Sequence, residues 1–139
     1  MPVRLAALSA QLREWIGRDP VGLVILEKVF LGKNVQSAFT LGQARGAVLA
    51  VLGENALPTE EVAVRSARKS VCGRGEASKE EIRQSLELLL NAKGRLEHLP
   101  LDASDALALA YHGWREHCLR HKIKAAQGRQ GGIQGEVKL

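Results

Sequence analysis

Val21-Gly22-Leu23-Val24-Ile25-Leu26 is the stretch that decides the fold class of this chain. Its residues are apolar without alternation, and several are β-branched, which is typical of a strand buried on both faces of a parallel sheet. Glu27 follows directly and marks the end of the strand. We therefore predict a buried strand over 21–26 with an acid at its carboxyl end.

Helical periodicity lies on both sides of this strand. Apolar residues between Arg4 and Gly17 recur at spacings of three, four and seven, and Pro20 ends the pattern because proline cannot continue the hydrogen-bond ladder. A second helix is predicted over 37–52. The residues expected to face inward in the two helices are Leu5, Leu8, Leu12, Trp15, Ile16, Phe39, Leu41, Ala44, Val48, Leu49 and Leu52.

The second half of the chain predicts one short strand and two helices. The strand candidate lies over 61–64. Ser78 with Glu81 three residues later is typical of a capping box, which predicts a helix over 78–90. Asp102 begins a last helix. We expect the inward-facing residues of that helix to be Ala106, Leu107, Leu109, Ala110 and Trp114.

The predicted order of helix, strand, helix, strand, helix, helix is an α/β arrangement. A strand buried on both faces needs a neighbour at each edge, and the sequence offers only one other convincing strand. We therefore expect that a strand pairing with 21–26 is absent from this chain.

The composition is that of one ordinary globular domain, with 45% hydrophobic and 25% charged residues among 139. It excludes wholesale disorder, and no apolar run is long enough to span a bilayer. The first residues enter an amphipathic pattern and are not typical of a signal peptide. Cys72 and Cys118 stand too far apart for a disulfide framework or a zinc finger, so we expect a reducing, cytoplasmic compartment.

The net charge of +5 is concentrated near the end of the chain, because five basic residues and one acid follow residue 118. From 122 to 139 the periodicity is lost, and we expect a basic, flexible tail. A second basic cluster lies within 65–74 and contains no acid. Such clusters favour a polyanion partner, although many solvated surfaces have the same composition.

Three acids stand where metal chemistry could use them. Glu27 closes the buried strand, and Asp102 and Asp105 lie at i and i+3 on one face of a helix start. Carboxylates can hold hard cations such as Mg²⁺, and two such ions clamp the attacking and leaving oxygens of a phosphodiester. The same acids could instead cap the helix and complement its dipole, and spacing alone favours that simpler interpretation.

Three blocks of sequence carry a more specific signature. The first is Leu26-Glu27-Lys28-Val29-Phe30, followed by Lys33-Asn34, Ser37-Ala38 and Leu41-Gly42-Gln43-Ala44-Arg45-Gly46. The second is Val71-Cys72-Gly73-Arg74-Gly75 with Ala77 and Lys79. The third is Asp102-Ala103-Ser104-Asp105-Ala106-Leu107-Ala108. In this order, over most of the chain, the blocks resemble the RuvC family of Holliday junction resolvases.

The resemblance implies a ribonuclease H-like fold and a homodimeric, Mg²⁺-dependent endonuclease that cuts four-way junction DNA. It implies that Glu27, Asp102 and Asp105 are three of four metal-binding acids, with two Mg²⁺ ions per site and Mn²⁺ as a substitute. It also implies that Lys79 acts near the scissile phosphate and that Phe30 stacks on junction bases. A RuvA-RuvB branch-migration complex is the further partner that family membership implies.

Several basic residues are expected to contact DNA beside Phe30 and Lys79, namely Arg68, Lys69 and Arg74. Arg68 stands where the family usually has a lysine, which keeps the charge but changes its geometry. The helix over 37–52 matches the helix at the family's dimer interface. We expect Arg45, within that helix, to make a structural or dimer contact.

The family's first metal ligand, an aspartate in a Gly-Ile-Asp-Pro-Gly-like motif on the first strand, has no match in this sequence. We therefore expect a partial RuvC-like nuclease domain over 1–121, with a ribonuclease H-like α/β fold that lacks its N-terminal strands. Two functions remain open. One is a junction-resolving nuclease, and the other is a catalytically incomplete remnant that binds DNA or dimerises.

Overall fold

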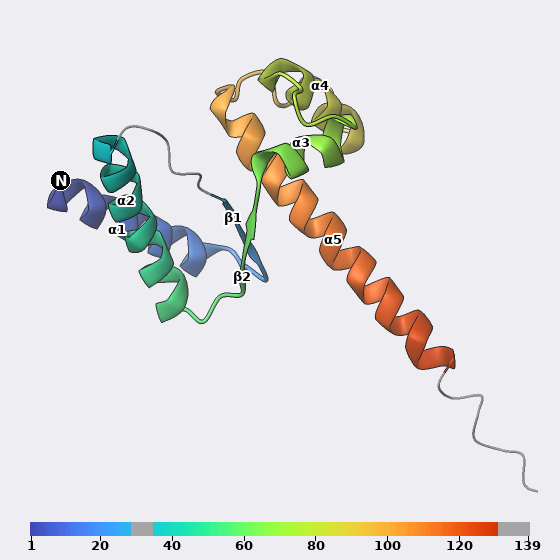
Figure 1. Cartoon of the computed structure of the whole chain (residues 1–139), viewed down its shortest axis with the longest axis horizontal. Helices are drawn as coiled ribbons and strands as arrows, with labels where there is room; N and C mark the ends of the chain where they lie inside the picture. Colours follow the sequence, from blue (N-terminus) through green and yellow to red (C-terminus); the bar gives the residue numbers. More distant parts are fainter. Residues whose placement is uncertain (29–34, 131–139) are drawn as a thin grey trace, which may run out of the picture. The chain divides into compact units, whose positions relative to one another are not determined.

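The computed structural model describes residues 1–28 and 35–130. The predicted α/β arrangement is confirmed, with one additional helix in the basic cluster. The elements are α1 (Pro2–Arg18), β1 (Val24–Glu27), α2 (Val35–Glu54), β2 (Thr59–Val62), α3 (Val64–Cys72), α4 (Lys79–Leu89) and α5 (Asp102–Gln130) (Figure 1). The chain divides into two compact units, 1–63 and 64–139. Each unit is described by itself.

In the first unit, β1 and β2 form a parallel pair, the only sheet within the described residues. Leu26 stands opposite Glu61, and Glu27 opposite Val62. The N–H of Lys28 donates to the Val62 carbonyl at 2.8 Å, so the ladder extends past the last residue of β1. A parallel pair needs a long crossover connection, and α2 lies within it.

The prediction that β1 is buried on both faces is wrong for the described structure. Val24, Ile25 and Leu26 are only half-buried, and Glu27 is exposed. Within the described residues β1 has one neighbouring strand, so the shortage of strands expected from the sequence is found there. The described part of this unit therefore leaves the apolar residues of β1 incompletely covered.

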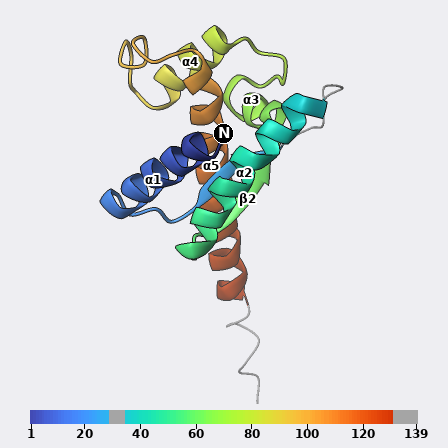
Figure 2. The same ribbon diagram turned by 90° about the vertical axis from the view of Figure 1, so that its left-hand side faces the viewer.

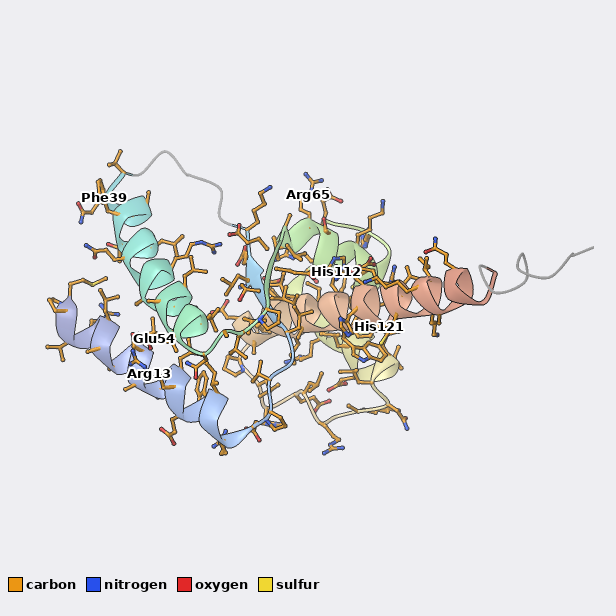
Figure 3. All side chains as sticks on the ribbon, turned by 90° about the horizontal axis from the view of Figure 1, so that it is seen from below. Arg13, Phe39, Glu54, Arg65, His112 and His121 are labelled. Carbon is orange, nitrogen blue, oxygen red and sulfur yellow. The ribbon has the colours of Figure 1, made fainter. Side chains whose placement is uncertain are left out.

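The helices α1 and α2 lie side by side in both ribbon views (Figures 1 and 2). Arg13 of α1 donates to both carboxylate oxygens of Glu54 at the end of α2 (Figure 3). An apolar groove runs between these helices and β1. Its apolar lining residues include Leu8, Leu12, Trp15, Ile16, Val24, Leu26, Val48 and Leu52.

The inward face predicted for α2 is only partly correct. Leu52 is buried together with Val51, whereas Phe39, Leu41 and Leu49 are exposed. Apolar residues occur on all sides of α2, so the sequence pattern could not single out the face that is buried. The apolar side chains near the start of α2 are consequently open to solvent within the described structure, with Phe39 66% exposed.

The second unit consists of α3, α4 and α5, and each of these helices contacts the other two. The predicted capping box is confirmed: Ser78 Oγ accepts from the Glu81 N–H, and the Glu81 carboxylate accepts from the Ser78 N–H at 2.8 Å. The core residues are Ala67, Val71, Ala77, Ile82, Leu86, Ala108 and Leu109.

The helix α5 differs from its prediction in its buried face and in its length. Leu109 is buried as predicted, but Ser104 and Ala108 are buried beside it, whereas Trp114 is 60% exposed. The helix continues to Gln130, past the expected tail boundary at 122. Lysine, alanine and glutamine dominate just beyond that boundary, and all three are good helix formers. No helix in the described part of the chain is long and apolar enough to cross a membrane.

Candidate active site

The start of α5 places Asp105 against Arg68 of α3. Arg68 Nε and Nη2 donate to Asp105 Oδ1 and Oδ2 at 2.9 and 2.8 Å, and Nη1 donates to the Ala77 carbonyl at 3.3 Å. The two side chains are only 23% and 19% exposed. Because two parallel hydrogen bonds fix a carboxylate in both position and plane, Arg68 orients Asp105.

One turn earlier on α5, Asp102 is paired with Lys79 of α4. Lys79 Nζ donates to Asp102 Oδ1. This hydrogen bond and the opposite charge lower the pKa of Asp102 and raise the pKa of Lys79. Asp102 is 89% exposed, so solvent screens the pair and it contributes little to folding. The pair instead affects the titration of Asp102, which stays ionised to a lower pH than an unpaired aspartate.

Helix starts position Lys79, Asp102 and Asp105, and the packing of α3, α4 and α5 brings these residues together with Arg68. Ser78 caps α4, so Lys79 is the first residue of that helix. Asp102 and Asp105 occupy the first turn of α5, where the helix dipole favours acids. Their i, i+3 spacing, predicted to place them on one face, directs both carboxylates to cations of the neighbouring helices.

Glu27 belongs to the first unit and is the exposed last residue of β1. Its main-chain carbonyl accepts a hydrogen bond from Arg45 Nη1 of α2 at 3.1 Å. A pocket of about 460 Å³ adjoins it, lined by Leu26, Glu27, Lys28, Leu41, Ala44, Arg45 and Val48. Phe30, predicted to stack on bases, lies outside the described residues.

The predicted basic cluster forms a shallow pocket after α3. Arg65 is paired with Glu76 and Arg74 with Glu81, while Lys69 lies exposed in the last turn of the helix. Gly73 ends α3 with φ of +77°, a left-handed conformation that favours glycine. The pocket is lined by Arg65, Ser66, Lys69, Gly73, Arg74, Gly75 and Glu76.

Asp102 and Asp105 have the donor chemistry that a divalent metal ion requires. Carboxylate oxygens are the ligands that Mg²⁺ prefers. Among the described residues, however, no three His, Cys, Asp or Glu side chains come together as a metal-binding group. Arg68 and Lys79 engage the carboxylates of Asp105 and Asp102 instead. A metal at these oxygens would therefore compete with two cations of the chain.

Sequence reasoning missed one contact between α3 and α5. Ser70 Oγ and His112 Nδ1 are 2.6 Å apart, and Arg115 Nη1 donates to the Ser70 carbonyl at 3.4 Å. Figure 3 labels His112 on α5. The hydroxyl partner of His112 lies 42 positions away in the sequence, which is too far for any spacing rule to detect.

The parallel strand pair with α2 in its crossover connection is the partial α/β arrangement expected of the ribonuclease H-like class. A family model described as "Crossover junction endodeoxyribonuclease RuvC" matches residues 1–112. The chain belongs to this family of nucleases, and the resemblance predicted from its sequence blocks is confirmed.

Individual relatives and solved structures also support membership of this family. The chain is 41% identical over 114 residues to the RuvC protein of Bdellovibrio bacteriovorus, covering 81% of this chain and 66% of the relative. It is 42% identical over 106 residues to that of Xylella fastidiosa, covering 76% and 57%. It thus spans less than two thirds of these relatives.

Among solved structures, the RuvC of Thermus thermophilus in complex with Holliday junction substrate matches with a TM-score of 0.70 and 28% identity. That match covers 78% of this chain and 65% of the other. A further structure of Thermus thermophilus RuvC matches with a TM-score of 0.63 and 29% identity, over 78% and 64% of the two chains. These matches confirm the predicted ribonuclease H-like fold.

Proposed function

We propose that this chain acts in a nuclease that resolves four-way junction DNA by metal-dependent phosphodiester hydrolysis during recombination and repair. The observation that carries the proposal is the start of α5, where Asp102 and Asp105 meet Lys79 and Arg68 within the region that the family model matches. Carboxylates are suited to hard divalent cations, and lysine and arginine are suited to phosphate oxygens. One small surface therefore carries both kinds of group that the reaction needs.

We assign the metal-ligating roles to Glu27, Asp102 and Asp105, with two Mg²⁺ ions as the metal and Mn²⁺ as a substitute. When bound, such ions activate a water molecule and stabilise the leaving oxygen. The chain's own residues prepare the ligands. Arg68 fixes the plane of Asp105, and Lys79 lowers the pKa of Asp102. We assign to Lys79 a contact with the scissile phosphate as well.

We assign DNA contacts to the basic residues Arg68, Lys69 and Arg74, together with Lys79 and Phe30. The shallow pocket after α3 supports the roles of Lys69 and Arg74, because both line it and Lys69 is exposed there. Because each phosphate contact releases a counterion, binding should weaken steeply as salt is added.

The partners follow from the same assignment. We propose a homodimer formed through α2, which is supported by the exposed apolar side chains of Phe39, Leu41 and Leu49. We also propose cooperation with a RuvA-RuvB branch-migration complex in the cytoplasm. That compartment suits Cys72 and Cys118, which are not paired with each other.

A catalytically incomplete DNA-binding or dimerisation remnant is the second candidate. It is favoured by the ion pairs that occupy Asp102 and Asp105. In this case the basic residues would bind a junction, and the acids would serve only to hold α5 against α3 and α4.

Junction cleavage with Mg²⁺ or Mn²⁺ separates the two candidates. For the nuclease we expect cleavage that Asp102→Asn and Asp105→Asn each abolish while junction binding persists. Glu80→Gln is the matched control, because Glu80 is an exposed acid at the start of α4. Binding without cleavage at any metal concentration supports the remnant, and the failure of both binding and cleavage overturns both candidates.

A further inference from the structure

We propose that Arg45 is a positioning residue that holds Glu27 in place at the carboxyl end of β1. Its assignment to the reaction rests on the proposed function, in which Glu27 is a metal ligand. The placement itself rests on contacts within the first unit alone. Arg45 lies in α2, far from Glu27 in sequence, and its guanidinium reaches the ends of both strands.

Arg45 joins the two strands at the point where each ends. Nη1 donates to the main-chain carbonyl of Glu27 at 3.1 Å. Nη2 lies 2.5 Å from Oε1 of Glu61, and Glu61 stands opposite Leu26 in the parallel register. One planar group thus contacts β1 through its backbone and β2 through a carboxylate, which a single ammonium could not do in the same way.

Burial restricts the Arg45 guanidinium to these two partners. The Arg45 side chain is 21% exposed, and its Nη2 atom is fully buried. That atom faces Glu61 as an ion pair but makes no aligned hydrogen bond. A buried cation with one charged partner and one carbonyl has few alternative positions, since leaving either partner would cost it a charge-assisted contact.

The contacts of Arg45 with the two strands do not involve the Glu27 carboxylate. Arg45 binds the carbonyl of Glu27, and its charge is balanced by Glu61 rather than by the Glu27 side chain. The ladder bond from the Lys28 N–H to the Val62 carbonyl belongs to the same peptide group as the Glu27 carbonyl that Arg45 binds. Arg45 can therefore fix where Glu27 projects without neutralising it, which is what a metal ligand requires of a supporting residue.

The test uses the 139-residue chain with Arg45→Lys and Glu61→Gln, and Arg13→Met as the matched control. Arg13 pairs with Glu54 in the same unit but touches neither strand end. Hydrogen exchange of the Lys28 amide reports the strand end without any metal. We expect Arg45→Lys to speed that exchange about tenfold, Glu61→Gln to speed it less, and Arg13→Met to leave it unchanged.

Mn²⁺ affinity, measured by water proton relaxation well below the melting temperature, supplies the second readout. We expect Arg45→Lys to weaken it about tenfold. Unchanged exchange at Lys28 overturns the proposal, and faster exchange with unchanged Mn²⁺ affinity reduces Arg45 to a structural contact and overturns it as well. If the unsubstituted chain binds no Mn²⁺, the metal chemistry of the proposed function fails, while Lys28 exchange still decides whether Arg45 holds the strand end.

Discussion

Arg68 and Asp105 are joined by two parallel hydrogen bonds of 2.9 and 2.8 Å between α3 and α5, at a site less than a quarter exposed. The same guanidinium also binds the Ala77 carbonyl just before the N-cap of α4. One side chain therefore connects an acid at the start of α5 to the two other helices of the second unit. The candidate site therefore also helps to hold the three helices of the second unit together.

Breaking the Arg68–Asp105 pair should destabilise the second unit. We expect Asp105→Asn to lower the free energy of unfolding by about 1–3 kcal/mol, because a partly buried guanidinium loses its charged partner. Urea unfolding measures the change. Arg13→Met is the control, because it removes an exposed pair whose loss should cost less than about 1 kcal/mol. Equal effects of the two substitutions would contradict the supporting role of Arg68.

The Lys79–Asp102 pair predicts a specific pH dependence. The pKa of Asp102 is lowered below its ordinary value of 3.8 in the folded chain, so the pair contributes above that pH and is lost as pH falls through the lowered pKa. We expect Lys79→Met to raise the pKa of Asp102 toward 3.8, as measured by carboxylate NMR titration. Lys93→Met is the control. An unchanged Asp102 midpoint in Lys79→Met would show that the pair does not form in solution.

The capping box of α4 predicts the effect of one hydroxyl. Ser78→Ala removes the oxygen that accepts the Glu81 N–H, and we expect a loss of about 1 kcal/mol in the free energy of unfolding. Ser66→Ala, on the exposed side of α3, should be neutral or slightly stabilising because alanine is the better helix former. Chemical denaturation of both variants checks the difference, and a Ser78→Ala variant as stable as the parent chain would argue against the cap.

The two units should differ in local stability. In the first unit only Val51 and Leu52 are buried among the described residues, and no residue of α1 is. The second unit buries side chains from all three of its helices. We expect amides of α1 and β1 to exchange with solvent faster than those in the middle of α4 and α5, as measured by native-state hydrogen exchange. Equal protection across both units would contradict this picture.

Sequence patterns predicted the helices and strands well, but they predicted less well which face of each helix is buried. The Ser78–Glu81 spacing identified the start of α4 because a capping box is a local interaction. In α5 the pattern favoured Ala106 and Trp114 as core residues, yet the buried face includes Ser104 and Ala108. The hydrophobic pattern could not predict that face, because the charged residue Asp105 lies on the same side of the helix. Its partial burial there is compensated by the ion pair with Arg68.

The candidate site was predictable only to the extent that the family's sequence blocks carry it. Spacing placed Asp102 and Asp105 on one side of a helix, and nothing local indicated that Lys79 and Arg68 would engage them. Lys79 lies 23 positions from Asp102 in the sequence, and Arg68 lies 37 positions from Asp105. Such pairings follow from how α3, α4 and α5 pack, and packing is not encoded in any single window of sequence.

The proposed function requires that this chain recognises the four-way DNA junction. Its most direct test is a competition experiment without divalent metal, in which a labelled four-way junction bound to the 139-residue chain is displaced by an unlabelled junction or by linear duplex of the same arm sequences. We predict that the junction competes at least about tenfold more strongly than the duplex at physiological salt. Equal competition by junction and duplex would contradict the account.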